Sequence, residues 1–262
     1  MDLELTGKHV LVTGGSRGIG LACAREFLRE GARVTLVGRS RDRMDQALAA
    51  LRAEGWTATG LCADLTDAAA ALQAVDQAEA AGGPVDILVN SAGAARRTPF
   101  AELQPQAWHD AMQAKFFTYV HVMDPLVKRM GARGAGAIVN VVGMGGKVAS
   151  PTHLAGGAAN AALMLASAGL AAAWGPKGVR VNAVNPAQTM TERLAEGLAA
   201  DARLRNTTPD EVLRQAQAKM PLGRLASAEE IATAVVFLAS PRASYISGAV
   251  LSMDGAATPM VV

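Results

Sequence analysis

Three glycines stand where the first apolar run of the sequence gives way to a helical pattern. The loop reads VTGGSRGIG, and Gly14, Gly18 and Gly20 follow a G-x-x-x-G-x-G spacing rather than the general G-x-G-x-x-G fingerprint. Glycine permits a tight turn and lets backbone N–H groups approach a dinucleotide pyrophosphate at a helix N-terminus. A strand–helix turn without a ligand explains some loops of this kind. The place of this loop in the first strand–helix unit favours a dinucleotide site.

Arginines follow the second apolar run, where the sequence reads VGRSRDR. Binding of a free ribose 2′-hydroxyl favours an acidic residue at this point, but the chain has Arg39 and Ser40. A guanidinium suits a phosphate through paired hydrogen bonds, and Arg17 of the glycine loop is expected nearby. We therefore predict NADP(H) rather than NAD(H) as the cofactor. In the alternative interpretation, both arginines are solvated surface charges.

These loops need a sheet to hold them, and apolar strand-like runs alternate with helix-period segments along the whole chain. Continuous apolar strands, each followed by a helix, are typical of a parallel sheet buried on both faces. The pattern predicts an α/β fold, with one doubly wound seven-stranded parallel sheet in a single domain over residues 1–262. Residues 187–222 depart from the alternation just after a strand, where a substrate lid is expected. The alternative there is a surface helix pair.

The bulk composition excludes several classes of protein. The net charge is +2 with no dense basic block, which argues against nucleic acid as a partner. The two cysteines, Cys23 and Cys62, have no metal-ligand spacing, so we expect no metal site and a reduced, cytoplasmic protein. An uncharged stretch, residues 155–174, is long enough for a membrane span. Its Ala and Gly content favours a helix packed inside a protein, and no membrane is expected as a partner.

Several motifs resemble, in combination, those of the short-chain dehydrogenase/reductase superfamily. They are TGGSRGIG, NSAG from Asn90 to Gly93, NPAQTMT from Asn185 to Thr191, and the closing segments PLGRLASAEEIATAVVFLAS and SGAVLSMDG. The resemblance covers nearly the whole chain and extends to the 3-oxoacyl-ACP reductase-like branch. It implies a Rossmann-like domain and hydride transfer between a nicotinamide and a ketone or secondary alcohol. It also implies a homo-oligomer, tetramer or dimer, that acts on a small-molecule substrate.

The resemblance also implies cofactor roles for individual positions. Around the phosphates it places Gly14, Ser16, Arg17, Gly18, Ile19 and Gly20. At the adenosine it places Asp64, Leu65, Asn90, Ala92 and Gly93, and at the nicotinamide Pro186 and Thr191. Asn90, Ala92 and Gly93 are also expected to stabilise the central strand. One departure is Ala187, where the family usually has glycine.

The superfamily's catalytic residues are missing from this chain. In the family a serine follows the fifth strand, and a tyrosine and a lysine follow it on the next helix. The matching positions here hold Gly143, Gly156 and Asn160, while the family's asparagine of the fourth helix falls on Lys115. Lysine and asparagine thus look exchanged, and Lys115 is expected to supply a cation beside the nicotinamide ribose. Independent drift at both positions is the alternative.

No such exchange restores the phenol that protonates the alkoxide of a reduced ketone. A positioned acid contributes about 10²–10⁴ in rate. His153, three residues before Gly156, is the best candidate, because an imidazole ordinarily has a pKa of about 6.5. In the alternative, SPTH is a helix start with Ser150 as its cap and His153 on the surface. The missing residues also leave open a non-redox function, as a regulatory or scaffolding subunit or as a lyase or isomerase with an enlarged pocket.

Overall fold

The computed structural model of the protein describes residues 1–93, 98 and 100–259. The strands of its main sheet are β1 (His9–Thr13), β2 (Arg33–Gly38), β3 (Thr59–Cys62), β4 (Ile87–Asn90), β5 (Gly136–Val141), β6 (Val179–Pro186) and β9 (Val250–Met253). They form one sheet in the order β3-β2-β1-β4-β5-β6-β9, and every neighbouring pair is parallel. The predicted doubly wound, seven-stranded parallel sheet is confirmed within the described residues.

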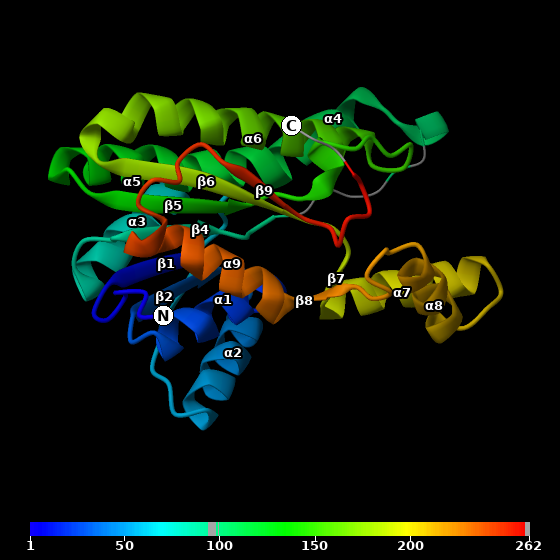
Figure 1. Ribbon diagram of the computed structural model, residues 1–262, viewed down its shortest axis with the longest axis horizontal. Helices are drawn as coiled ribbons and strands as arrows, with labels where there is room; N and C mark the ends of the chain where they lie inside the picture. The colour runs from blue at the N-terminus through cyan, green and yellow to red at the C-terminus, as the bar shows by residue number, and fades with distance from the viewer. Residues whose placement is uncertain (94–97, 99, 260–262) are drawn as a thin grey trace.

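Helices cover both faces of this sheet (Figure 1). One face carries α1 (Gly18–Arg29), α2 (Arg41–Ala53) and α9 (Ala228–Ala239), and the other carries α3 (Ala68–Gly82), α5 (Thr118–Arg133) and α6 (Leu154–Trp174). Successive residues of β1 divide between the two cores, with Val10 and Val12 on the α1 side and Leu11 on the α5 side. Because side chains alternate along a strand, a strand covered on both faces is apolar throughout, which accounts for its continuous apolar run.

The strand order creates a crevice at the carboxyl ends of β1 and β4. From β1 the chain proceeds to β2 and β3 on one side, and then crosses to β4 and continues through β5, β6 and β9 on the other. The connections after β1 and β4 therefore leave the sheet in opposite directions. Ligands of open α/β sheets bind in the crevice at such a switch point.

The segment between β4 and β5 includes a change of helix type. It runs from α4 (Pro105–Ala111) through η2, a π-helical segment (Met112–Phe117), directly into α5. Lys115 lies in η2 and is buried. A π-helical turn inside an α-helix is rare and is frequent at functional sites. Short 3-10 turns occur elsewhere as η1 (Phe100–Glu102), η3 (Met144–Gly146), η4 (Gly175–Lys177) and η5 (Pro241–Ala243).

The expected departure from the alternation is present after β6. The chain there forms β7 (Thr189–Met190), α7 (Glu192–Leu204) and α8 (Pro209–Ala218), and returns through β8 (Ala226–Ser227), which pairs with β7. Figure 1 shows α7 and α8 as a helix pair set apart from the helices that cover the sheet. The role of this segment as a lid remains a prediction.

The uncharged stretch of the sequence forms α6. Among the described residues, this helix with the turn that follows it is long and apolar enough to cross a membrane, by length and composition alone. Its buried residues recur once per turn at Ala159, Leu163 and Ser167, and the helix packs along β6 and η2. The core helix of a folded domain passes the same test of length and composition, and α6 is packed as such a helix.

Candidate functional site

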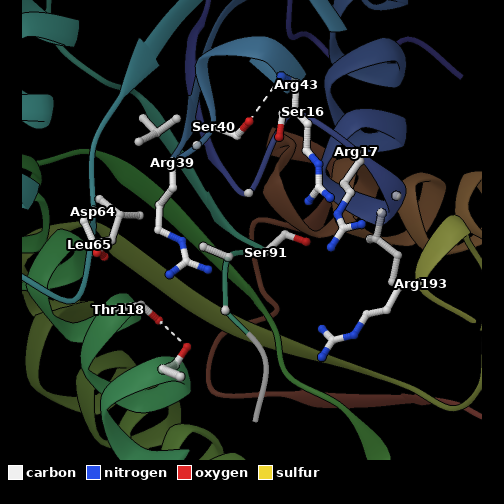
Figure 2. A pocket seen from close by; sticks show the side chains of 18 of the residues that line it. Ser16, Arg17, Arg39, Ser40, Arg43, Asp64, Leu65, Ser91, Thr118 and Arg193 are labelled. Atoms are coloured by element: carbon white, nitrogen blue, oxygen red, sulfur yellow. Dashed lines mark hydrogen bonds between the residues drawn. The ribbon is translucent and has the colours of Figure 1, made fainter. Parts of the chain in front are cut away.

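A cleft of about 640 Å³ lies at the switch point of the sheet (Figure 2). Its walls come from the glycine loop, the segments that follow β2, β3 and β4, and the starts of α5 and α7. Of the predicted cofactor residues, the cleft brings together Gly14, Ser16, Arg17, Gly18, Ile19, Arg39, Ser40, Asp64, Leu65, Ala92, Gly93 and Thr191. Gly20, Asn90 and Pro186 do not line it.

The glycine loop is shaped by close approaches of the backbone. A Cβ atom on Gly14, whose φ is +66°, would lie 2.7 Å from the carbonyl oxygen of Ser91. A Cβ atom on Gly20 would overlap the carbonyl group of Gly14. The absence of a side chain at Gly20 therefore lets the first turn of α1 pack directly against the backbone of the loop. A Cβ on Gly18 would lie 3.5 Å from Cγ2 of Thr191. The start of α7 therefore stands beside the N-terminus of α1.

Guanidinium groups surround this cleft. Arg39 extends into it from the end of β2, and Arg17 and Arg43 lie close together on another wall (Figure 2). Ser40 caps α2 by accepting a hydrogen bond from the backbone N–H of Arg43 at 3.4 Å. This capped first turn brings Arg43 back over the end of β2. Arg43 was not among the predicted residues, although it belongs to the same RSRDR run as Arg39.

Asp64 is fixed at the end of β3 by its own turn. Its Oδ1 accepts hydrogen bonds from the backbone N–H of Thr66 at 3.0 Å and from the Thr66 hydroxyl at 2.8 Å. The backbone hydrogen bond lowers the pKa of Asp64 below its ordinary value against partial burial, and the Thr66 hydroxyl and the charge of Arg39 assist it. An ionised, oriented carboxylate therefore lines the cleft on this side.

Asn90 takes part in the sheet rather than in the cleft. Its Oδ1 accepts from the Thr13 hydroxyl at 3.1 Å, and its Nδ2 donates to Oδ1 of Asn140 at 3.0 Å. Asn140 in turn donates to the hydroxyl of Ser167 on α6 at 2.8 Å. These buried hydrogen bonds connect β1, β4, β5 and α6. Such a position is consistent with the expectation that Asn90 stabilises the central strand. A contact between Asn90 and the ribose remains a prediction.

The place of the missing serine lies where β5 ends in a glycine turn, residues 143–146. Gly143 has a φ of +132°, and its N–H donates to Oδ1 of Asn185 at 3.1 Å. A Cβ atom on Gly143 would lie 3.3 Å from Nδ2 of Asn160 and 4.0 Å from the carbonyl oxygen of Pro186. Asn160 and Pro186 therefore border the space that a serine side chain would enter.

His153 borders the same turn. It is half-buried and is the N-cap residue of α6, so Ser150 does not cap this helix as the alternative interpretation held. A Cβ on Gly145 would lie 2.9 Å from Cδ2 and 3.5 Å from Nε2 of His153, and 3.6 Å from Nδ2 of Asn160. His153 and Asn160 thus approach one point on the glycine turn. Gly156 is buried in the first turn of α6 between them in sequence.

Lys115 is held by a different set of partners. Its Nζ donates to the Tyr119 hydroxyl at 2.8 Å and to the carbonyl oxygen of Val141 at 3.0 Å, and the residue is only 8% exposed. Burial lowers the pKa of Lys115 to about 7, and the positive charge of Arg193 adds to this effect. A buried amine therefore lies behind the end of β5, and its role as a cation beside the nicotinamide ribose remains a prediction. Its hydrogen bonds go to Tyr119 and the strand and not to Asn160.

Arg193 joins the site from the first turn of α7. Figure 2 shows its side chain directed into the cleft from the side opposite Arg39. One turn further along α7, Glu196 forms an ion pair with Arg17 of the glycine loop at 3.4 Å. No sequence motif marks Arg193, because its place depends on how α7 returns to the cleft.

Comparisons with known proteins agree with this geometry. A family model described as enoyl-(acyl carrier protein) reductase matches residues 14–258. Gluconate 5-dehydrogenase of Gluconobacter oxydans (strain 621H) is 35% identical over 255 residues, which cover 97% of this chain and 96% of that protein. The chain belongs to the short-chain dehydrogenase/reductase superfamily.

Other members of the superfamily are similar along their whole length. Galactitol 2-dehydrogenase (L-tagatose-forming) of Cereibacter sphaeroides is 38% identical over 257 residues, covering 97% of this chain and 96% of that protein. The crystal structure of L-sorbose reductase from Gluconobacter frateurii, complexed with NADPH and L-sorbose, superposes with a TM-score of 0.92. It is 30% identical and covers 97% of this chain and 98% of that one.

Proposed function

We propose that this protein is an NADP(H)-dependent oxidoreductase that transfers hydride between the nicotinamide and a ketone or secondary alcohol. The observation that carries the proposal is the cleft at the switch point, which combines a glycine loop, a helix N-terminus and several arginines. The relatives named above are dehydrogenases and reductases, and one of them was solved with NADPH. These likenesses support the same class of reaction for this chain.

The cleft fits NADP(H) in size and in charge. Its volume of about 640 Å³ lies within the range of small-molecule pockets. The first N–H groups of α1 have no partner inside the helix and favour the pyrophosphate. Arg17, Arg39 and Arg43 line the cleft and would supply positive charge for the 2′-phosphate, and we expect Asp64 to contact the adenine. When bound, the nicotinamide supplies or accepts the hydride.

We assign Arg193 to the pyrophosphate. Thr191 stands beside Gly18 at the start of α1, so a side chain two residues further along the chain is within reach of the same phosphates. The guanidinium enters from the side opposite Arg39, on the same side as Arg17 of the glycine loop, which suits a contact with phosphates at the N-terminus of α1. Because Arg193 belongs to α7, this contact would tie the segment 187–222 to the cofactor and supports its role as a lid.

The reducing direction needs a proton donor for the oxygen of the substrate. His153 is our candidate, since its ring lies beside the glycine turn at the end of β5. Asn160 and Lys115 are the other two residues that we expect to organise this end of the site. Gly143 and Gly156 contribute no side chains there, which leaves room for a substrate.

Reduction of a panel of ketones headed by L-sorbose, followed through the oxidation of NADPH, tests the proposed reaction. We expect turnover by the wild-type protein and a loss of about 10²–10⁴ in rate for His153→Ala. The exposed neighbour Thr152 provides the matched control, and Thr152→Ala should keep its rate. Tight binding of NADPH without turnover of any ketone would contradict the redox function.

The replaced catalytic residues favour a second candidate function. A regulatory or scaffolding subunit, a lyase or an isomerase needs the cofactor cleft but not a serine, tyrosine and lysine set. Such a protein would bind NADPH and leave it unoxidised in the same assay. The measurement that tests the first function therefore also decides between the two.

We also propose that the protein acts as a homotetramer or homodimer in the cytoplasm. On the side away from its core, α6 presents Ala158, Ala161 and Gly169 around Leu165, which is 77% exposed. Small residues let two helices approach closely. The free thiols of Cys23 and Cys62 suit a reducing compartment. Light scattering that gives the mass of one chain would contradict the oligomer.

A further inference from the structure

We propose that Asn160 takes the place of the missing serine, and not that of the missing lysine, by binding the carbonyl oxygen of the substrate. This inference rests on the proposed reductase function and assigns one part of it to a named atom. Nδ2 of Asn160 lies 3.3 Å from the position that a Cβ atom of residue 143 would occupy. The amide therefore reaches the space of a serine side chain. An amide N–H at that place donates a hydrogen bond to a substrate oxygen, as a hydroxyl would.

The amide of Asn160 is free to bind a ligand. The residue is only 6% exposed, and within the described part of the chain its side chain makes no hydrogen bond. The polar atoms of this amide keep some contact with solvent, so a substrate oxygen can take the place of water there. Lys115 differs in this respect, because its amine is already bonded to Tyr119 and Val141. Asn160 is thus the better donor for a substrate.

The glycine turn explains how Asn160 comes to lie there. A Cβ atom on Gly157 would lie 2.7 Å from the carbonyl oxygen of Gly145. One on Gly146 would lie 2.8 Å from the backbone nitrogen of Ala161. Real Cβ atoms do not approach backbone so closely, so these positions admit only glycine. Their absent side chains let the start of α6 pack directly on the turn, which carries Asn160 to the end of β5.

The backbone at Gly143 also argues for a rebuilt site rather than a decayed one. Its φ of +132° is a conformation that residues with a Cβ atom rarely adopt. A serine at this position would be strained, and its hydroxyl would crowd the amide of Asn160. A serine at position 143 would therefore need a different backbone conformation, whereas the observed conformation suits a glycine with the amide of Asn160 beside it.

His153 is our candidate for the proton donor, a role that the amide of Asn160 cannot fill. An amide N–H stabilises negative charge on oxygen but does not protonate it. Bound NADPH would supply the hydride to the carbonyl carbon, and the electrons of the C=O π bond would move to the oxygen. Asn160 would hold this oxygen while the His153 imidazolium gave it a proton. The reaction would leave NADP⁺, a neutral imidazole and the alcohol.

The decisive test compares cofactor binding with turnover in Asn160→Ala. We expect kcat/KM for the best ketone of the panel to fall about 10²-fold, while the Kd for NADPH stays unchanged. Asn160→Asp keeps the shape of the side chain and removes the donor, so it should lose turnover as well. A weaker Kd for NADPH with unchanged kcat would assign Asn160 to the lysine's place and overturn the proposal.

Gly143→Ser provides the second test. We expect it to lower kcat/KM, with retained NADPH binding as evidence that the variant is folded. Gly175→Ser at the exposed end of α6, where a Cβ atom would meet nothing within 4 Å, is the matched control and should keep its activity. A gain of activity in Gly143→Ser would overturn the proposal. If the wild type oxidises NADPH with a ketone but Asn160→Ala is unaffected, the inference fails while the proposed function stands.

Discussion

The amine of Lys115 lies 2.8 Å from the hydroxyl of Tyr119, four residues further along the chain, and both groups donate to the carbonyl oxygen of Val141. The order K-x-x-x-Y reverses the order of tyrosine and lysine that the superfamily places on the following helix. Tyr119 is fully buried, and burial raises its pKa, so its phenol does not replace the missing acid. The pair instead clamps the end of β5 two residues before Gly143.

The charge of Lys115 should make stability depend on pH. Its pKa is about 7 in the folded protein and 10.5 when unperturbed, so the unfolded chain binds more protons between these values. The free energy of unfolding should therefore rise as the pH increases through this window, by at most about 1.4 kcal/mol per pH unit. Urea titrations across the window should show this rise in wild type and in the control Lys219→Met. They should show a smaller rise in Lys115→Met, and equal slopes in all three proteins would refute the account.

Removal of the Tyr119 hydroxyl should destabilise the protein. Tyr119→Phe leaves the ring in place but takes an acceptor from Lys115 and a donor from Val141 at a buried site. We expect a loss of about 1–3 kcal/mol in the free energy of unfolding. Tyr245, which is fully exposed, offers the control Tyr245→Phe, for which we expect no change. A Tyr119→Phe variant as stable as wild type would show that the clamp contributes nothing.

Arg193 should matter equally to both nicotinamide cofactors. Because the pyrophosphate is common to NADPH and NADH, Arg193→Met should weaken the two to the same extent, roughly tenfold to a hundredfold for a lost charged hydrogen bond. Binding of 2′-AMP, which has no pyrophosphate, should not change. Arg214→Met on α8 is the control, since Arg214 pairs with Glu211 away from the cleft. An effect confined to the KM of the ketone would assign Arg193 to the substrate.

Glu196 is expected to compete with the cofactor for Arg17. The ion pair joins the glycine loop to α7, and Glu196 is 64% exposed at its side chain. Glu196→Gln should therefore tighten NADPH binding by a few fold at low salt and leave stability almost unchanged, because exposed pairs contribute about 0–1 kcal/mol. Glu211→Gln, in α8, serves as the control. Weaker NADPH binding in Glu196→Gln would mean that the pair helps to form the site.

The cofactor half of the site could be predicted from sequence because its signals are local. The glycine loop and the run after β2 each lie in one short segment whose residues reach the cleft within a turn of the strand they follow. Arg43 could have been included on the same grounds. Arg193 could not, because it enters the cleft from a segment about 150 residues further along the chain than Arg39.

The positions of the candidate catalytic residues could not be predicted in this way, because they depend on how helices and strands pack against one another. The sequence shows Asn160 at the position of a lysine, but only the packing of α6 on the glycine turn brings its amide to Gly143. In the same way, Lys115 lies in a π-helical segment, which a pattern of apolar residues does not reveal. The contact between Lys115 and Tyr119 joins that segment to the start of α5. These relationships arise from tertiary structure, and the exchange of lysine and asparagine remains a prediction.

The most direct test of the central claim is a fluorescence titration of wild type and Arg39→Asp with NADPH and with NADH. If the cleft binds NADP(H) through the 2′-phosphate, wild type should prefer NADPH. Arg39→Asp should then lose far more affinity for NADPH than for NADH. Binding of neither cofactor by the wild-type protein would contradict the account, and equal losses in the variant would refute the role of Arg39.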